Sequence, residues 1–315
     1  MTSGEWLAGV ALKESDRDYL VRRISPTESL EDLTEFPRYF EIETVNACQA
    51  KCPMCTIADW NRKDGVMKDD LFEKIADEIC AHPEVRRVHL YRDGEPLLDK
   101  KLGARVARLK CGGVREVGIS TNVELLDERR ALEILQAGLD EIILSIDSMV
   151  GSVYSKIRVG LDFGKVRDNA FRFFQLRDGL RSKCRIRVRM IRQELNEHEW
   201  YHGRFQAEWM PRLKPGDTVE ALDLHDWGGQ LKGFKHRVAN TTRPCLALWS
   251  LMCIFADGSV PLCNVDYNKT YPLGNVRTAT IAELWQSHEQ NRRRVSHRNE
   301  IGMCKNCTVW AEKAA

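Results

Sequence analysis

Three cysteines stand close together in the run Cys48-Gln-Ala-Lys-Cys52-Pro-Met-Cys55. The β-rich segment 39–46 precedes them, so we expect the run to lie in a loop directly after a strand. Three thiolates on one loop can bind three corners of a four-iron cluster and leave one iron open to chelate a small molecule and pass an electron to it. The alternatives are three incidental core cysteines or a zinc site, but zinc wants a fourth ligand, and the nearest downstream histidine or cysteine, Cys80, falls in a predicted helix.

A second set of four cysteines occupies the C-terminal part of the chain. Its members are Cys245, Cys263, Cys304 and Cys307. A predicted hairpin and helix between them would fold back and bring the two pairs together. Four thiolates make a closed site, which suits structural zinc as well as an iron–sulfur cluster, and the spacing alone leaves the choice between the two metals open.

Short β-rich runs alternate with helical segments between these two cysteine sets. The predicted strands cover 39–46, 86–92, 115–121, 141–147, 185–191 and 218–224, and the predicted helices cover 69–81, 98–110, 127–138, 162–179 and 194–210. Such alternation predicts an α/β fold with a parallel sheet and crossover helices, and six strands favour a partial (β/α)6 TIM-like barrel. The three-cysteine loop would then lie at the carboxyl end of the strands, where the active sites of such folds are built.

The chain divides into three predicted parts. Residues 1–37 form an N-terminal leader that packs on the outside, 38–240 form the barrel, and 241–315 form a small C-terminal domain. In that last part, 251–255 and 260–263 flank Asp257-Gly258, a turn dipeptide that suits a tight β-hairpin. A helix capped by Thr278 or Thr280 and running to about residue 295 follows.

On these residues the chain resembles the radical S-adenosylmethionine (SAM) superfamily. The C-x3-C-x2-C loop after the first strand is similar to the family's cluster motif, and the pattern C-x12-G-x4-C from Cys245 through Gly258 to Cys263, with the terminal C-x2-C, is similar to a twitch domain, a shortened SPASM domain. The resemblance implies two [4Fe-4S] clusters. One, on Cys48, Cys52 and Cys55, would bind and cleave SAM, and the other, on the four C-terminal cysteines, would be auxiliary.

The resemblance also assigns residues to SAM. Asp93-Gly94-Glu95-Pro96 is similar to a motif whose backbone and acid hold the methionyl ammonium, with Asp93 in place of its first glycine, and Met54 replaces an aromatic that lies against the adenine. Polar residues end many strands, but their order here matches the family. The remaining assigned positions lie at successive strand ends and are Ser120, Asn122, Ser145 and Arg189.

Two further residues are candidates for contact with a substrate. Cys253 lies between the first two auxiliary ligands in sequence, and a thiol S–H is a good hydrogen-atom donor to a carbon radical. If Cys253 returned hydrogen to the opposite face of a carbinol carbon, the net reaction would be epimerisation; a core cysteine that points away is the alternative. Asp147, at the end of the fourth strand, either binds a substrate hydroxyl or ammonium or caps the following turn.

Composition excludes several classes of protein. With 43% apolar and 30% charged residues, the chain is an ordinary globular protein, and a net charge of +2 without a basic block gives no support for a nucleic-acid partner. The acidic N-terminus is not a signal peptide, and no apolar run is long enough to span a membrane, so a cytoplasmic protein is expected. Eleven cysteines in a reducing compartment indicate metal ligands rather than disulfides.

One motif points elsewhere. His198-Glu199-Trp-Tyr-His202 matches the H-E-x-x-H signature of zinc proteases. It falls on the predicted helix 194–210, away from the catalytic loop, and we therefore interpret it as part of a solvated amphipathic helix.

The family resemblance implies a reaction. Relatives with one auxiliary cluster include enzymes that epimerise or oxidise hydroxyl-bearing carbons of aminoglycoside and aminocyclitol antibiotics. The expected function is epimerisation of a carbinol carbon in such a sugar-like substrate, with Cys253 as hydrogen donor. A flavodoxin or ferredoxin would supply the enzyme with electrons. The alternatives are a dehydrogenase that uses the auxiliary cluster as electron acceptor, a maturase of a ribosomal peptide, and a non-catalytic zinc scaffold.

Overall fold

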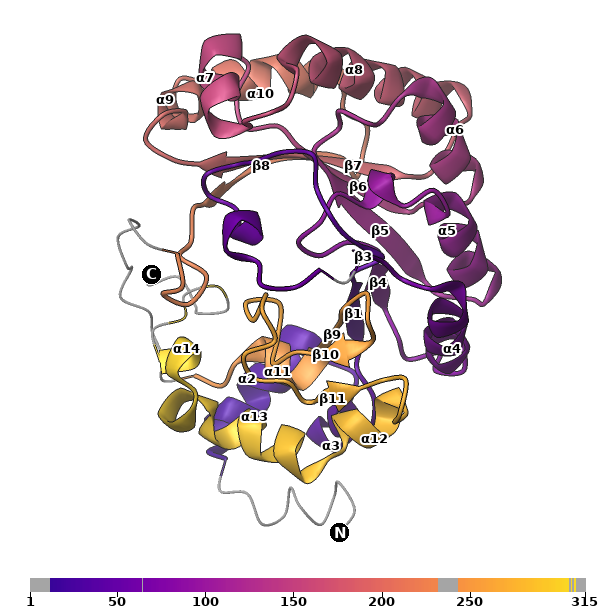
Figure 1. The fold of residues 1–315 in the computed structure, drawn as a ribbon, viewed down its shortest axis with the longest axis vertical. Coiled ribbons are helices and arrows are strands. Elements are labelled where there is room, and N and C mark those ends of the chain that lie inside the picture. Colours follow the sequence, from indigo (N-terminus) through magenta and orange to yellow (C-terminus); the bar gives the residue numbers. More distant parts are fainter. Residues whose placement is uncertain (1–11, 64, 232–242, 306, 308, 310–315) are drawn as a thin grey trace.

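A seven-stranded sheet forms the centre of the protein in the computed structural model, which describes residues 12–63, 65–231, 243–305, 307 and 309 (Figure 1). Its strand order is β8-β7-β6-β5-β4-β1-β9, and every neighbouring pair is parallel. The sheet curves into a partial barrel, so the expected fold class is confirmed. The strands are β1 (Tyr39–Ile42), β4 (Arg87–His89), β5 (Glu116–Thr121), β6 (Glu141–Ser145), β7 (Arg185–Arg192), β8 (Thr218–Asp223) and β9 (Leu251–Ile254).

Crossover helices cover the convex face of this sheet (Figure 1). They are α4 (Asp69–Cys80), α5 (Leu102–Cys111), α6 (Glu128–Gln136), α7 (Gly151–Ile157) and α8 (Phe163–Gly179). Every second strand residue packs beneath them, as the registers Phe40↔Val88 and Ile142↔Ile186 illustrate, and these side chains are almost fully buried. The alternation of a strand therefore sends the other half of its residues to the concave face.

Charged side chains line the concave face. Glu116 on β5 pairs with Arg87 and with Arg185 at 2.7 Å, and Glu220 on β8 pairs with Arg187 at 2.9 Å and with Arg189 at 2.6 Å. Each of these charges has a partner on a neighbouring strand, so the interior of the barrel is polar but close to neutral.

Strand β9 differs from expectation. The sequence predicted a hairpin of 251–255 with 260–263, whereas residues Leu251–Ile254 join the main sheet, parallel to β1, with the register Glu41↔Cys253. The small two-stranded sheet consists of β10 (Ser259–Val260) and β11 (Gly274–Asn275) instead. Asp257-Gly258 still forms the expected turn, because Gly258 has φ +89, where a β-carbon is disfavoured.

The C-terminal helices pack against the N-terminal ones. α2 (Glu14–Ile24) and α3 (Leu30–Glu35) share a second hydrophobic core with α11 (Leu246–Ser250) and the four C-terminal cysteines. The helix expected after Thr280 is divided into α12 (Ile281–Trp285) and α13 (His288–Glu300), because Ser287 caps a new helix. Figure 1 shows α2 and α3 among these C-terminal elements.

The predicted helix 194–210 is also divided. α9 (Glu197–Tyr201) ends at His202, and α10 (Arg204–Trp209) follows Gly203, whose φ of +72 breaks the helix. Glu199 is not solvated as expected: it is fully buried, where Ser148 Oγ and Met149 N donate to its carboxylate. The glutamate of the zinc-protease motif therefore ties the α9 region to the loop after β6.

Short elements frame the loops at the carboxyl ends of the strands. β2 (Val45–Asn46) pairs antiparallel with β3 (Gly65–Val66), and the turns η1 (Thr56–Asp59), η2 (Pro96–Leu98) and η3 (Met210–Arg212) complete the element list together with α14 (Gly302–Lys305). Over the part of the chain that is described, no helix is both long and apolar enough to cross a bilayer.

Leu20 is expected to be important for the second core. It is fully buried on α2, so Leu20→Ala should destabilise the protein by about 2–5 kcal/mol through lost burial and an unfilled cavity. Urea unfolding under anaerobic conditions measures the change. Asp18→Ala, at an exposed position of the same helix, is the control and should stay within about 0.5 kcal/mol of the wild type. Equal stability of Leu20→Ala and wild type would contradict the packing role of α2.

Candidate active site

The three-cysteine loop lies where β1 ends. Cys48, Cys52 and Cys55 line one cavity of about 140 Å³ together with side chains from the loops after β4, β5 and β6. Cys55 N donates to Cys52 O at 3.0 Å, which closes a tight turn between two of the cysteines. The chain thus brings three sulfur atoms to one side of a cavity at the carboxyl ends of the strands.

The three thiols suit an iron–sulfur cluster. Burial, reinforced by the neighbouring cysteines, raises the pKa of Cys48 to about 12 and of Cys55 to about 11. The Cys48 and Cys55 thiols therefore resist ionisation unless positive charge lies beside them. A metal centre supplies that charge, and its binding displaces the protons.

The loop after β4 packs tightly on the segment before the cysteines. A β-carbon at Gly94 would lie 2.3 Å from Val45 O and 2.8 Å from Ala47 O, so only glycine fits there. Glu95 N donates to Ala47 O at 2.8 Å. The glycine is therefore required for the approach of this loop to the cysteine loop.

The Glu95 carboxylate joins the loops after β4 and β5. It accepts from Thr121 Oγ1 at 2.7 Å, from Asn122 N at 2.8 Å and from Leu97 N at 3.1 Å. Burial raises its pKa to about 7, although these hydrogen bonds act in the opposite direction. Of the roughly four acceptor positions of a carboxylate, protein groups thus occupy three, and one position on Oε2 stays available beside the backbone of this loop.

Polar side chains from β5 and β6 complete the same cavity. Ser120 Oγ and Ser145 Oγ lie 3.2 Å apart, and Asn122 Nδ2 donates to Cys48 Sγ at 3.7 Å. Gln49 Nε2 in turn donates to Asn122 Oδ1 at 3.1 Å. The residues assigned to SAM on three different loops thus meet at the cysteines.

Other assigned residues lie outside this cavity. Met54 is buried in the main hydrophobic core, Pro96 begins the turn η2, and Arg189 pairs with Glu220 on the concave face. Asp147 is also fully buried: its carboxylate accepts from Arg158 Nε at 2.6 Å and from Ile191 N at 2.6 Å. In this arrangement Asp147 holds an arginine and the carboxyl end of β7.

Arg158 is a site residue that the sequence interpretation missed. Asp147 orients it, and its Nη1 donates to Cys52 Sγ at 3.8 Å, so a cation lines the cavity beside a candidate cluster ligand. Asp147 and Cys52 raise its pKa despite the opposing effect of burial, so it stays charged. It follows α7 without any local motif, and only its position in the fold marks it.

The four C-terminal cysteines surround a second cavity. Cys245 is the N-cap position of α11, Cys263 follows β10, Cys304 lies in α14, and Cys307 comes just after. Burial, reinforced by neighbouring cysteines, raises the pKa of Cys245 to about 11 and of Cys304 to about 12. Four desolvated thiols around one cavity form a closed donor set of the kind that binds an iron–sulfur cluster.

A buried chain of charges connects the two sites. Arg62, just after the cysteine loop, pairs with Glu43 at 2.8 Å and with Asp93 at 3.5 Å, and Asp93 pairs with Arg92. Arg92 Nη2 donates to Cys263 O at 3.0 Å, and the Phe255 ring centroid lies 3.6 Å from the Arg62 guanidinium and 4.3 Å from that of Arg92. Asp93, which stands where the motif has a glycine, thereby links the loop after β4 to the C-terminal domain.

Cys253 lies at the edge of this charged chain. It is register partner to Glu41 and therefore shares the concave face with it, and its Sγ donates to Glu41 Oε2 at 3.8 Å. Burial and the Glu41 charge raise its pKa well above the ordinary value, which keeps the thiol protonated. Cys253 is not among the residues that line the cavity of the other four cysteines.

Comparison with known families agrees with this geometry. Residues 42–176 match the model of the radical SAM superfamily, and residues 245–308 match that of the SPASM iron–sulfur cluster-binding domain. The first match covers the cysteine loop and the strands around its cavity, and the second covers the other four cysteines. A radical SAM domain implies SAM and a [4Fe-4S] cluster, and a SPASM domain implies a further iron–sulfur cluster.

Two curated relatives share part of the sequence. The chain is 32% identical over 110 residues to the tungsten-containing aldehyde ferredoxin oxidoreductase cofactor-modifying protein of Pyrococcus furiosus, covering 35% of this chain and 31% of that protein. It is 30% identical over 131 residues to a probable GTP 3′,8-cyclase of Methanococcus maripaludis, covering 41% of this chain and 43% of the cyclase. The chain thus spans less than half the length of these relatives.

Solved structures share the fold over most of the chain. BtrN in complex with AdoMet and 2-DOIA superimposes with a TM-score of 0.59 at 20% identity, covering 86% of this chain and 92% of BtrN. Streptococcus suis SuiB bound to precursor peptide SuiA gives a TM-score of 0.67 at 15% identity, covering 89% of this chain and 73% of SuiB. At these identities the likeness extends to the fold alone.

Iron analysis can separate the two sites. The wild-type chain, reconstituted anaerobically, should hold about eight irons, because each of the two cysteine sets is assigned one four-iron cluster. Replacing Cys48, Cys52 and Cys55 by alanine should leave about four irons. A separate double variant, with both Cys245→Ala and Cys263→Ala, should also leave about four. Colorimetric iron and sulfide analysis measures both. Zinc in place of iron at the second site would contradict this assignment.

Arg158 should influence the electron affinity of the first cluster. A cation that donates to Cys52 Sγ stabilises the more negative, reduced state, so Arg158→Gln should move the reduction potential to a more negative value. A redox titration followed by electron paramagnetic resonance measures the shift in preparations with full iron content. Arg187→Gln, at a paired arginine on the concave face, is the control. An unchanged potential in Arg158→Gln would contradict the contact.

Proposed function

We propose that this chain, a radical SAM enzyme with a C-terminal SPASM domain, epimerises a hydroxyl-bearing carbon of an aminoglycoside or aminocyclitol intermediate, with Cys253 as hydrogen-atom donor. When bound, the first cluster and SAM supply the radical that removes hydrogen from the carbon. Cys253 then returns hydrogen to the opposite face. The chain's own contribution is to hold the substrate between these two groups and to exclude water.

The placement of Cys253 carries the proposal. Because parallel register partners point to the same face, the Glu41↔Cys253 pairing puts the thiol on the concave face, which also bears Ser120 and Ser145 of the SAM-side cavity. A donor of a hydrogen atom must be a thiol rather than a thiolate. Burial and the adjacent Glu41 raise the pKa of Cys253 and maintain that form.

The polarity of the barrel interior supports a hydroxyl-rich substrate. The concave face carries paired glutamates and arginines rather than apolar side chains, which suits a ligand rich in hydrogen-bonding groups. BtrN, which shares the fold, was solved with AdoMet and 2-DOIA, and its chain is covered almost throughout. A small polar molecule is therefore our preferred substrate class. We propose a flavodoxin or ferredoxin as the electron donor to the enzyme.

Two alternative functions are tested by the same assay. A dehydrogenase would oxidise the same carbinol to a ketone and pass an electron to the auxiliary cluster, which the charged chain from Arg92 connects to the SAM-side loop. A peptide maturase is supported by the shared fold with SuiB, solved with its precursor peptide. These alternatives differ from epimerisation in the product that they form.

The decisive experiment uses anaerobic enzyme with SAM, a low-potential reductant and a panel of aminoglycosides in deuterated water. Wild-type enzyme should place one deuterium on the inverted carbon, because the Cys253 thiol exchanges with solvent. Cys253→Ala should still cleave SAM but lose the epimer by at least about 100-fold, and mass spectrometry with NMR measures both.

A matched control is Cys184→Ala, which removes a buried cysteine on the convex side of the fold. It should leave the yield of epimer unchanged. A ketone product in the wild type would favour the dehydrogenase. The same epimer from Cys253→Ala and wild type would exclude Cys253 as donor.

A further inference from the structure

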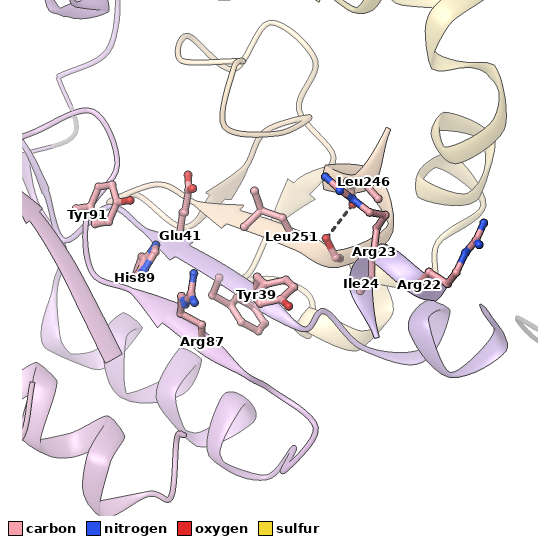
Figure 2. Close-up of a pocket in the computed structure, with 12 residues that line it drawn as sticks. Arg22, Arg23, Ile24, Tyr39, Glu41, Arg87, His89, Tyr91, Leu246 and Leu251 are labelled. Carbon is pink, nitrogen blue, oxygen red and sulfur yellow. Dashed lines mark hydrogen bonds between the residues drawn. The ribbon is translucent and has the colours of Figure 1, made fainter. Parts of the chain in front are cut away.

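A second cavity in the barrel, of about 590 Å³, shares Tyr91 with the cavity that Cys48, Cys52 and Cys55 line. Its walls come from β1, β4, α2 and α11, and Glu41, His89 and Tyr91 are among its lining residues. Figure 2 shows Glu41 and Tyr91 at one end of the lining residues and Arg22 at the other, where Arg22 is exposed to solvent. At about 30 Å³ per water molecule, this volume holds roughly 20 waters. The cavity therefore connects Glu41 to bulk water.

Glu41 separates this cavity from Cys253. The Cys253 side chain is 1% exposed, and its Sγ donates to Glu41 Oε2 at 3.8 Å, while Glu41 itself lines the cavity. Glu41 thus contacts both a buried thiol and a water-accessible cavity. The proposed function gives this contact a purpose.

We propose that Glu41 is the proton donor that regenerates Cys253 after each turnover, using the cavity as its route to solvent. This inference rests on the proposed role of Cys253. When the thiol gives a hydrogen atom to a carbon radical, the S–H bond breaks, the C–H bond forms and a thiyl radical remains. One electron from a reductant of the flavodoxin or ferredoxin class and one proton from the Glu41 carboxyl restore the S–H bond. Cavity water then protonates the carboxylate.

The other neighbours of the thiol are unsuited to this role. Arg92 also interacts with Cys253, but a guanidinium does not release its proton in a protein. Asp93 is engaged in ion pairs with Arg92 and Arg62. Glu41, by contrast, has Asn264 Nδ2 at 3.5 Å as a second partner and no ion pair within 4 Å among the described residues.

The acidity of Glu41 suits repeated proton transfer. Burial raises its pKa to about 7, an increase that Arg92 opposes and Asp93 reinforces. Near neutral pH both forms of the carboxyl are then populated. A group with these properties can give up a proton and take one back without a large energetic cost in either direction.

The test follows hydrogen exchange of the thiol and needs no substrate. Holoenzyme without SAM is transferred into deuterated water, and the S–H band of Cys253 is followed by infrared spectroscopy. The difference from Cys253→Ala identifies the band. Glu41→Gln, which keeps the shape but not the acidity, should slow exchange by roughly 100-fold, at the low end of the contribution of a positioned acid–base group.

Matched variants separate this role from a structural one. Glu116→Gln changes another carboxylate on the concave face, paired with Arg87 and Arg185, and should leave the exchange rate unchanged. Glu41→Asp keeps the acid but withdraws it by one methylene, so it should slow exchange less than Glu41→Gln. If Glu41→Gln lacks the wild-type iron content, Glu41→Asp serves as the test variant.

Two outcomes are distinguishable. Exchange in an iron-replete Glu41 variant at the wild-type rate would overturn the relay, whatever the enzyme's reaction. If exchange is slowed in the Glu41 variant but Cys253→Ala forms the same product as the wild type, the proton relay is supported and the proposed function is excluded. With both intact, Glu41→Gln should complete its first turnover at the wild-type rate and be slower than the wild type in every later turnover.

Discussion

The parallel pairing of β9 with β1 is the contact on which the arrangement of this protein depends. It adds a strand from the C-terminal domain to the barrel sheet and fixes the register Tyr39↔Leu251 and Glu41↔Cys253. The main-chain hydrogen bonds of a parallel ladder hold this register along the whole strand, and a slip by one residue would turn Cys253 to the convex face. The position of Cys253 relative to Glu41 is therefore set by backbone pairing.

Buried charges then hold the two cysteine sites in a fixed relation. Taking Arg62, Arg92, Glu43 and Asp93 out of water is costly, and only close pairing offsets that cost. Such a network is a poor source of net stability, but it penalises any arrangement that separates its partners. Its members come from the end of β1, the segment after the cysteine loop and the loop after β4, and Arg92 donates to Cys263 O, so the network specifies how the domains meet.

The strands, helices and cysteine motifs of the barrel could be predicted because each depends on local pattern. Residues 141–147 contain only a short run that fits a buried strand, and the structure has β6 at Glu141–Ser145. The segment 251–255 was assigned to a hairpin because a turn dipeptide follows it, and nothing local indicates that β1, more than two hundred residues away, is its partner. Arg158 was missed for the same reason, since its pairing with Asp147 joins distant residues.

The sequence by itself determined which atoms are available for chemistry: three thiols on one loop, four in the C-terminal part, and a further cysteine between them. Residue type and spacing are properties of the chain, so metal chemistry and cofactor class could be inferred without coordinates. Only the tertiary structure decided that Cys253 shares a face and a hydrogen bond with Glu41, and that Glu41 opens onto a cavity. Those relations arise from strand pairing and burial across the whole fold, because a local sequence pattern does not specify its distant partner.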